Sequence, residues 1–498
     1  RSDHLVFVPA DCIVAPDAFD VIHDLVVHDP GVDFAYFDST GYHAADPVRL
    51  AEPHHRPGYS PDRLRAQMYL GEMFLVSRPV AEAAEAKQTA PDATITAPPT
   101  HQLASTMAAL SGVIAHVPRL LYRVPLPEPA RSVGDRRPAS AEPSISNRTA
   151  GQRLLDETGF PARVRASAAD DGILRFDPEL VTKPSVSIVM PTNGSQRSID
   201  GRPTVLCLQA IDSVIAKTAY PDYELVLVVT PGAPPDLAAQ VLSTVDAHPP
   251  NLQPTIRFCR DDRPFNFANA CNRGAVAAAG EFLVFLNDDT VVVTENWLQR
   301  LTMYGSRPDI GAVGARLHYG NGRIQHAGIW TRGGHPSHRY ERFPADHTGY
   351  GHSLLVPQNC LAVTGACLGV ANDKFCEVGG FSPEFPSSFN DVDLCLKLDD
   401  LGYRTVVDPE IVLTHYEASS RDPKIDDWEL ALLHERWRSI ITEDPYDNPN
   451  HLAPQSEEYP APDPFVTEQK RLAGLIDFMP RVWPRPRLTA EPIEEPVS

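Results

Sequence analysis

Short apolar runs alternate with amphipathic stretches through the middle of the chain. The runs read SVSIVMP from residue 185, YELVLVV from 223, TIRFCR from 255 and EFLVFLNDD from 281, and stretches with helical spacing separate them. Apolar runs joined by helices are typical of a parallel sheet that is covered on both faces. Right-handed crossovers bring the carboxyl ends of such strands to one edge, where open α/β sheets bind ligands. Polar residues at the ends of these runs are therefore the first candidates for a functional site.

The segments on either side have different patterns. Residues 1–126 again alternate strand-like runs, such as Phe34–Phe37, with helix-like ones, which predicts a second α/β unit. Residues 127–183 begin with a stretch rich in Pro, Arg and Ser and predict a linker with a short helix over Gly151–Phe160. Beyond the unit at 184–445, residues 446–498 are rich in proline. They predict a tail that packs on the surface or is partly disordered, with one helix at Val466–Phe478.

Composition narrows the class of protein. The 498 residues allow about three average domains. Because 65 acidic residues oppose 44 basic ones, the net charge is −21, which repels phosphate polymers and argues against a nucleic-acid binder. The eight cysteines form no C-x-x-C pair and have no zinc-site spacing. No apolar stretch approaches the roughly 18 residues of a membrane span, and the first residues lack the zones of a signal peptide. We therefore expect reduced thiols and a cytoplasmic location.

The tetrapeptide Asn287-Asp288-Asp289-Thr290 follows the apolar run Phe282–Leu286 and so lies at the predicted ligand edge. Two adjacent carboxylates repel each other unless a cation is present. Mg²⁺ and Mn²⁺ sites combine one or two carboxylates with substrate phosphate oxygens, as a nucleoside diphosphate would supply. The alternative is a helix N-cap, a role that Asp and Thr also favour.

A second cluster, Asn390-Asp391-Val392-Asp393, opens a run with helical spacing. Carboxylates in a first helical turn are held anionic by the macrodipole, and an anionic carboxylate can act as general base toward a sugar hydroxyl. Capping alone is the other interpretation. His415 ends the strand-like run Thr405–Leu413. A neutral imidazole can complete a divalent site, although a single His at a strand end is more often structural.

The sequence lacks the motifs that are typical of several other enzyme classes. The chain has no G-x-S-x-G, P-loop or G-x-G-x-x-G sequence, so esterase, NTPase and Rossmann dehydrogenase activities lack their usual support. Five histidines at 326, 335, 338, 347 and 352 are irregularly spaced in a glycine-rich region. This spacing indicates an irregular loop over a site rather than a zinc cage.

Residues 184 to about 450 resemble a family 2 glycosyltransferase of the GT-A fold, in the bacterial rhamnosyltransferase-like group that builds cell-surface polysaccharide. The matching stretches include VSIVMPT, FNFANACNRGAVAAAGEFLVFLNDDT, GAVGARLHYGNGRIQHAG, AVTGACLGV, VGGFSPEF, NDVDLCLKLDDLGYR and HYEASSR, in family order over more than 200 residues. The resemblance implies an α/β fold with a mixed, Rossmann-like sheet flanked by helices. It also implies an inverting transfer of a sugar from a nucleotide-diphosphate donor to a growing cell-surface glycan.

The resemblance assigns roles residue by residue. It implies Asp391 as the catalytic base and Mn²⁺ or Mg²⁺ as the cofactor, held by Asp289, its neighbour Asp288, and His415. Donor-binding residues implied in the same way are Pro191, Thr192, Asp262, Asn272, Asn287, Thr364, Gly365 and Ala366. Acceptor-binding residues are Gly380, Phe381, Asn390 and Asp393. The implied donors are dTDP- or UDP-sugars, with dTDP-rhamnose as one candidate. A lipid-linked glycan acceptor would add peripheral contact with the inner face of the cell membrane.

The chain departs from the family pattern at two places in this unit. Thr230-Pro231-Gly232-Ala233 replaces a turn in which an Asp usually contacts the nucleotide base. Cys271 stands where a basic residue often precedes Asn272.

Residues 1–126 resemble the later part of the same fold in degenerate form. Only Asp11 remains of the metal motif, and Thr100–Gln102 occupies the place of the base-bearing pair. Such a module would bind glycan, support its neighbour, or serve packing alone. Two other functions compete for the whole chain. One is a non-catalytic glycan-binding or scaffold protein, and the other is a sugar nucleotidyltransferase, whose Gly-rich, basic pyrophosphate loop is not visible.

Overall fold

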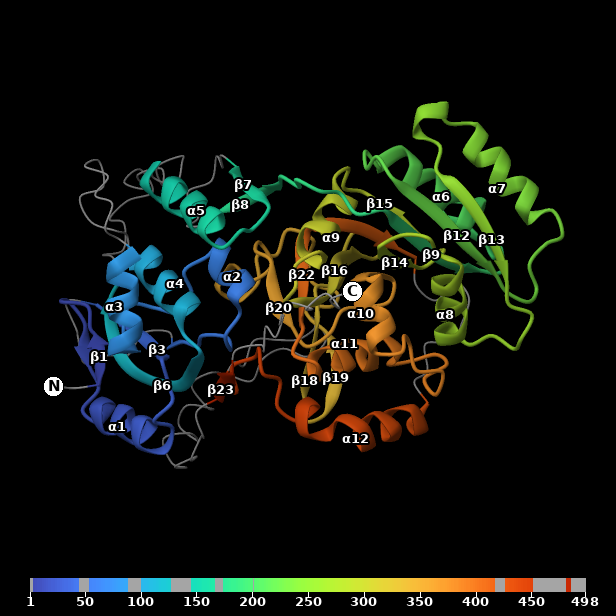
Figure 1. Ribbon diagram of the computed structural model, residues 1–498. Helices are drawn as coiled ribbons and strands as arrows, with labels where there is room; N and C mark the ends of the chain where they lie inside the picture. Colours follow the sequence, from blue (N-terminus) through green and yellow to red (C-terminus); the bar gives the residue numbers. More distant parts are fainter. Residues whose placement is uncertain are drawn as a thin grey trace, which may run out of the picture.

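The computed structural model describes residues 3–43, 53–87, 100–126, 145–165, 173–199, 201–416, 426–450 and 481–484. The helix predicted at Val466–Phe478 and most of the predicted linker and tail lie outside these residues. Two mixed β-sheets, each flanked by helices, lie side by side (Figure 1). The predicted α/β class, with a mixed sheet between helices, is confirmed. Within the described residues, every helix is too short or too polar to span a membrane.

The larger sheet contains the predicted apolar runs as parallel strands. β9 (Val186–Thr192) lies between β12 (Tyr223–Val229) and β14 (Phe282–Leu286), and β13 (Thr255–Arg260) extends the sheet beyond β12, all in parallel. Beyond β14 the order continues with β21 (Cys367–Ala371), β16 (Ile310–His318), β22 (Arg404–His415) and β15 (Thr290–Val292). β21 is antiparallel to both of its neighbours, which makes the sheet mixed. β17 (Ile324–His326) pairs with β16, and β20 (Gln358–Cys360) pairs with β22.

Helices cover this sheet on both faces because its strands are apolar on both faces. One face packs against α6 (Leu206–Lys217), α7 (Leu237–Asp246) and α9 (Trp297–Gly305). The other packs against α8 (Phe267–Ala277), α10 (Asn372–Glu377), α11 (Asn390–Asp400) and α12 (Asp427–Ile441). Gly274 lets α8 approach β9 closely, since a Cβ at this position would lie 2.3 Å from Val189. Two hairpins, β10 (Gln196–Ile199) with β11 (Arg202–Val205) and β18 (Ile329–Arg332) with β19 (His335–His338), and the short helices Pro250–Leu252 and Tyr350–His352 complete the unit.

The N-terminal sheet repeats part of the larger one strand for strand. It consists of β1 (His4–Phe7), β5 (Phe74–Ser77), β3 (Phe34–Tyr42), β6 (Val113–Pro125) and β2 (Ile13–Val14), with helices α1 (Ala18–His28), α2 (Pro61–Ala66), α3 (Arg78–Lys87) and α4 (Thr100–Leu110). The successive pairings are antiparallel, antiparallel, parallel and antiparallel, as in β14-β21-β16-β22-β15. β4 (Pro53–His54) pairs with β3 as β17 pairs with β16. β23 (Arg481–Pro484) pairs with β6 as β20 pairs with β22.

The segment between the two sheets contains more structure than the sequence predicted. The helix α5 runs from Ile145 to Glu157, so it begins and ends earlier than the predicted Gly151–Phe160. It ends before Gly159, whose φ of +62° breaks the helix, and Phe160 then packs on Tyr304 of the larger unit. A hairpin of β7 (Ala162–Arg165) and β8 (Arg175–Pro178), absent from the prediction, follows.

Buried polar contacts join the two sheets. α2 lies against β20 (Figure 1). Asn359 of β20 accepts hydrogen bonds from Ser60 Oγ (3.0 Å) and from the Asp62 backbone N–H (3.2 Å), and its amide donates to Asp62 Oδ2 (2.9 Å). All three residues are buried. We name this set, Ser60, Asp62 and Asn359, the α2–β20 clamp.

Residues 446–450, where the predicted tail begins, are described and include buried residues. Tyr446, Asn448 and Asn450 are buried, and the two asparagines bond the N-terminal sheet. The Asn448 amide donates to Asp38 Oδ2 (2.8 Å), and the Asn450 amide donates to the carbonyl of Pro118 (2.5 Å). A proline-rich composition signals extended backbone, but polar side chains can still anchor such backbone to a partner surface.

Candidate functional site

The site begins where β14 ends. Asn287 follows β14 directly, and its N–H donates to the carbonyl of Ala366 (3.1 Å). The chain then turns into β15, where Thr290 pairs with His415, the last residue of β22. This register brings His415 Nε2 to 3.0 Å from Asp289 Oδ1, and both side chains are largely buried. The hydrogen bond from the Tyr416 N–H to the Asp289 carbonyl (3.0 Å) fixes the two segments against each other.

The hydrogen bonds of His415 make Nε2, the nitrogen beside Asp289, an acceptor. Gln325 Oε1, which can only accept, lies 2.8 Å from His415 Nδ1, so Nδ1 carries a proton. In a neutral ring Nε2 is then an acceptor, and it faces a carboxylate. Asn287 adds a third acceptor, because its buried Oδ1 has no hydrogen-bond partner while its amide nitrogen lies 3.3 Å from His415 Nε2.

This set of atoms fits a hard divalent cation. One carboxylate, one imidazole with a fixed tautomer and one amide oxygen are suitable ligands for Mn²⁺ or Mg²⁺. In the part of the chain that the structure describes, no three His, Cys, Asp or Glu side chains gather closely enough to hold a metal by themselves. The remaining ligands of a cation here would therefore have to come from the Asn287 amide and from a bound substrate.

Asp288 turns toward β9 instead. Its Oδ2 accepts a 2.6 Å hydrogen bond from Thr192 Oγ1 at the end of β9. Burial raises the pKa of Asp288 to about 6; the Thr192 hydrogen bond opposes this rise and the charge of Asp289 adds to it. Thr192 is buried, and Pro191 precedes it in the strand. The hydroxyl of Thr230, the residue in place of the expected Asp, donates to the carbonyl of Thr192 (3.2 Å) and so supports this strand end.

The loop Thr364–Gly365–Ala366 connects Asp391 to the same strand end. Gly365 N–H donates to Asp391 Oδ2 (2.9 Å), and Val392 N–H donates to Oδ1 (2.9 Å). Asp391 lies in the first turn of α11, which begins after Phe389 with its left-handed φ of +61°. Two N–H donors thus orient this carboxylate in the first turn of the helix, where the macrodipole favours a negative charge. Because Ala366 of the loop bonds to Asn287, Asp391 belongs to the same neighbourhood as Asp289 and His415.

Three of the four residues predicted to contact the acceptor have side chains that face the interior. Asp393 is fully buried and accepts from Ser382 Oγ (2.5 Å) and Trp437 Nε1 (2.9 Å). It lies two positions after Asp391, about 200° around the helix, and therefore on the opposite side. The amide of the buried Asn390 donates to the carbonyl of Ser387 (3.2 Å).

The third of these residues, Phe381, packs its ring on Phe285 with centroids 4.8 Å apart. Gly380, the fourth, adopts a φ of +69° in the turn before it. Asn272 holds this turn: it donates to the Phe381 carbonyl (2.8 Å) and accepts from the Phe381 N–H (2.9 Å). Each polar atom of Asn272 thus makes a hydrogen bond within the protein.

The predicted donor residue Asp262 lies at the protein surface. The Asp262 side chain is 87% exposed, and Arg260 lies 3.9 Å away. Asp261 is the buried acid at this strand end, where its N–H bonds to the Val229 carbonyl (3.0 Å) and its carboxylate pairs with Arg263 (2.7 Å). The sequence signal was present, since Asp261 immediately follows the apolar run of β13.

Sequence reasoning missed Gln325 and assigned the wrong local structure to His326; both residues touch the site. Gln325 holds His415, and its neighbour His326 accepts a hydrogen bond from the Thr364 N–H (3.4 Å). His326 was assigned to a loop over a site, whereas it lies in β17 and is fully buried. An uncharged Gln in a short edge strand has no pattern that identifies it in advance.

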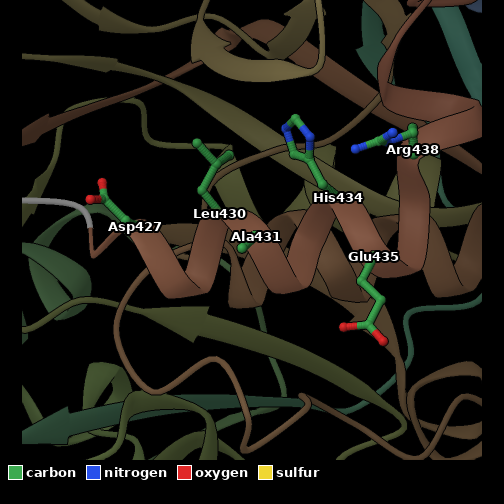
Figure 2. Close-up of a pocket in the computed structure, with 6 residues that line it drawn as sticks. All are labelled: Asp427, Leu430, Ala431, His434, Glu435 and Arg438. Atoms are coloured by element: carbon green, nitrogen blue, oxygen red, sulfur yellow. The ribbon is translucent and has the colours of Figure 1, made fainter.

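A surface groove of about 730 Å³ lies apart from these residues, along α12. Leu430 and His434 project from one side of this helix (Figure 2). The groove is lined by Asp427, Leu430, Ala431, His434, Glu435 and Arg438. It includes no residue of the strand-end site, so its size alone does not identify it as the place of the chemistry.

Comparison with known proteins identifies a family for the part of the chain that contains Asn287, Asp288 and Asp289. Residues 203–361 match the model described as glycosyl transferase family 2, and the chain thus contains a family 2 glycosyltransferase domain. The O-antigen biosynthesis protein RfbC of Myxococcus xanthus is 30% identical over 463 residues, which are 90% of this chain and 34% of that protein. The uncharacterized protein y4gI of Sinorhizobium fredii is 33% identical over 276 residues, 54% of this chain and 29% of that protein.

The chain therefore spans about a third of the length of these two curated relatives. Among solved structures, GalNAc-T7 with UDP, GalNAc and Mn²⁺ is similar at 17% identity and a TM-score of 0.42, over 63% of this chain and 61% of that one.

Proposed function

We propose that the chain is an inverting, metal-dependent glycosyltransferase that moves a sugar from a nucleotide-diphosphate donor to a growing cell-surface glycan. One observation carries the proposal. Asp289 and His415 lie 3.0 Å apart at the end of β14, and Asp391 is bonded to the loop that joins the same strand end. This arrangement supports a cation-binding role for the first pair and a base role for Asp391, at the edge of the sheet where α/β folds bind ligands.

The chemistry divides between the two halves of the site. Asp289, His415 Nε2 and Asn287 Oδ1 would hold Mn²⁺ or Mg²⁺, which when bound supplies positive charge for the departing diphosphate. Asp391 takes the proton from the acceptor hydroxyl as its oxygen forms a bond to the anomeric carbon. The bond from that carbon to the diphosphate oxygen breaks on the opposite face, so the configuration inverts. The N–H groups of Gly365 and Val392 keep the Asp391 carboxylate oriented while it accepts the proton.

The donor side of the site is proposed at the ends of β9 and β14. Pro191, Thr192, Asn287 and the loop Thr364–Ala366 lie there, with Asp288 bonded to Thr192. Asp261 replaces Asp262 in this proposal because it is the acid at the strand end. Asn272 is left out because its amide already holds Phe381.

The division of the chain is also a proposal: a degenerate module at 1–126, a linker at 127–183, a catalytic domain at 184–445 and a tail at 446–498. The repeated strand order supports it. In the β2–β6 register, Ile13 pairs with Arg123 as Val291 pairs with Thr414, so the place of His415 falls to Val124. An apolar side chain there removes the imidazole ligand, which favours a supporting or glycan-binding module over a second catalytic one.

The name of the Myxococcus relative supports polysaccharide synthesis as the pathway class. A dTDP- or UDP-sugar donor, a glycan or lipid-linked glycan acceptor, and action in the cytoplasm or at the inner face of the membrane remain part of the proposal.

Nucleotide release tests this function. The full chain is incubated with UDP- and dTDP-sugars, Mn²⁺ or Mg²⁺, and acceptor glycans. We expect Asp391→Asn to lower kcat by about 10² to 10⁴-fold while donor binding persists, because the base acts only in the chemical step. Asp289→Ala should abolish metal-dependent nucleotide binding. Asp400→Asn, an exposed change at the other end of α11, is the matched control and should leave both unchanged.

Two results would contradict the proposal. Full activity in Asp391→Asn would remove the assigned base. Nucleotide binding without turnover, with every donor and acceptor tried, would favour the non-catalytic glycan-binding or scaffold function.

A further inference from the structure

Two histidines outside the predicted metal and base residues form a close pair behind the 364–366 loop. His326 Nδ1 of β17 lies 2.7 Å from His338 Nδ1 of β19. The ring planes are nearly perpendicular, at 81°. His326 is fully buried, whereas His338 is partly exposed. The short distance means that one of the two nitrogens carries a hydrogen and the other accepts it.

The backbone around His326 decides which nitrogen is the donor. His326 Nε2 faces two N–H groups, those of Gly328 (3.2 Å) and Thr364 (3.4 Å), so Nε2 must be an acceptor. A neutral imidazole has one N–H, which then lies on Nδ1 and points at His338. His338 must accept at Nδ1 and carry its own hydrogen on Nε2. Burial, together with the nearby His338 and His415, lowers the pKa of His326 well below its ordinary value, which agrees with a neutral ring.

We propose that His338 and His326 are positioning residues that hold the 364–366 loop, and with it the Gly365 N–H that orients Asp391. The proposal rests on the proposed function for the role of Asp391 as base. His338 acts on His326 by accepting its Nδ1 hydrogen, which leaves His326 Nε2 free to accept from Thr364. Gly365, the next residue, donates to Asp391 Oδ2 at 2.9 Å. Both histidines therefore act on Asp391 indirectly, through the 364–366 loop, without contact with the reacting atoms.

The neighbouring residue supports a positioning role for β17 as a whole. Gln325 bonds His415 in the cation-binding half of the site, while His326 bonds the loop that carries Asp391. Successive side chains of a strand point to opposite sides, so one short strand reaches both halves. The two contacts should therefore be separable by mutation: Gln325 should govern metal affinity, and His326 with His338 should govern the chemical step.

Two substitutions of His338 test the proposal, because one keeps and the other removes the atom that accepts the hydrogen bond from His326 Nδ1. The carbonyl oxygen of Asn occupies nearly the position of the His Nδ1 atom, so His338→Asn keeps an acceptor for His326, whereas His338→Ala removes it. We expect His338→Ala to lower kcat about tenfold, the scale of one lost hydrogen bond, with the donor KM unchanged. His338→Asn should keep kcat within about twofold of the unmodified protein. His335→Ala, an exposed change in the same strand, is the control and should have no effect.

Equal losses of kcat in His338→Asn and His338→Ala would overturn the proposal, as would an unchanged kcat in His338→Ala.

A second measurement does not depend on activity. Long-range ¹⁵N–¹H spectra of the ¹⁵N-histidine-labelled full chain report the tautomer of each ring, with His326 assigned by its loss in His326→Gln. We expect His326 to be neutral with its hydrogen on Nδ1 in the unmodified protein and in His338→Asn. A hydrogen on Nε2, or a doubly protonated ring at neutral pH, would overturn the proposed pair. If no donor and acceptor support transfer, this spectrum still decides the pair, so failure of the proposed function is seen separately.

Discussion

Asp62 is the charged centre of the contact between the two sheets, and its loss should destabilise both. The carboxylate is fully buried and bonds Arg65 Nη1 (2.7 Å), the Asn359 amide (2.9 Å) and Arg307 Nη1. Burial raises the pKa of Asp62, but the charges of Arg307, Arg65 and Arg404 outweigh this and hold it well below its ordinary range. Asp62 is therefore anionic at neutral pH, and Asp62→Ala would leave Arg307 and Arg65 close together without it.

The expected cost follows from this arrangement. Removing one partner of a buried ion pair costs about 3–5 kcal/mol. At a urea m-value of about 3 kcal/mol/M, the unfolding midpoint should fall by about 1 to 2 M. Asp177→Ala is the control, because Asp177 pairs with Arg165 at the surface (3.1 Å) and is 51% exposed. A surface pair contributes at most about 1 kcal/mol, so the midpoint should move by less than about 0.3 M.

Tryptophan fluorescence makes the assay specific for coupling between the sheets. Four of the five tryptophans, at 297, 330, 428 and 437, lie in the larger unit, whereas Trp483 lies in β23, which pairs with β6 of the N-terminal sheet. The assay therefore uses a Trp483→Phe background, in which fluorescence reports the larger unit. A shift of the fluorescence midpoint by a substitution at residue 62 therefore requires the clamp to transmit it. If Asp62→Ala moves this midpoint no further than Asp177→Ala, the reasoning is refuted. Because the pKa of Asp62 is lower in the folded protein than in the unfolded chain, its contribution to the free energy of unfolding is complete above about pH 4 and is lost as the pH falls further. The unfolding midpoints of the unmodified protein and Asp62→Ala should therefore become equal in acid.

Three further predictions concern other contacts. Gly58→Ala should lower the thermal midpoint, because its Cβ would lie 1.9 Å from the Pro445 carbonyl oxygen and displace the 446–450 segment; an unchanged melting curve would argue against that packing. Gln325→Leu should weaken Mn²⁺ binding by about 10 to 100-fold in calorimetric titrations, since His415 loses the acceptor that fixes its tautomer, and equal affinity would contradict this role. Asp38→Asn should reduce thermal stability at pH 7. Burial raises the pKa of Asp38, but its hydrogen bonds to two buried histidines outweigh burial and lower the pKa, so Asp38 is an anion in the folded protein. The difference should shrink below about pH 4 as the Asp38 carboxylate of the unmodified protein becomes protonated, and a difference independent of pH would exclude an ionic origin.

The sequence was sufficient to predict the parallel strands and the acidic residues that follow them. Strands buried on both faces must be continuously apolar, so β9, β12 and β14 could be predicted directly. β13 is a largely exposed edge strand, and its place followed from the alternation of strands and helices. The residues after them were sound candidates because topology brings parallel strand ends together. Asp289 and His415 do lie close together, although the strands β15, β16, β21 and most of β22 come between them in the sequence.

Contacts between distant polar side chains could not be predicted in this way. Asn359 and Asp62 are 297 positions apart, and neither lies in a pattern that points to the other. The orientation of Asp393 depends on α12, whose Trp437 covers that side of α11. The burial of Asn448 and Asn450 could not be predicted either, because composition reports backbone stiffness and carries no information about which surface the backbone lies on.

The position of Asn448 and β23 has a consequence for synthesis on the ribosome. The side chains that cap Asp38, and the strand that covers the outer edge of β6, are translated only after the complete larger unit. Because the ribosome adds about 5 to 20 residues per second, this edge of the nascent N-terminal sheet stays unpaired for tens of seconds. During this interval it is a target for chaperones and for wrong partners, so expression yield should depend on elongation speed over the second half of the message.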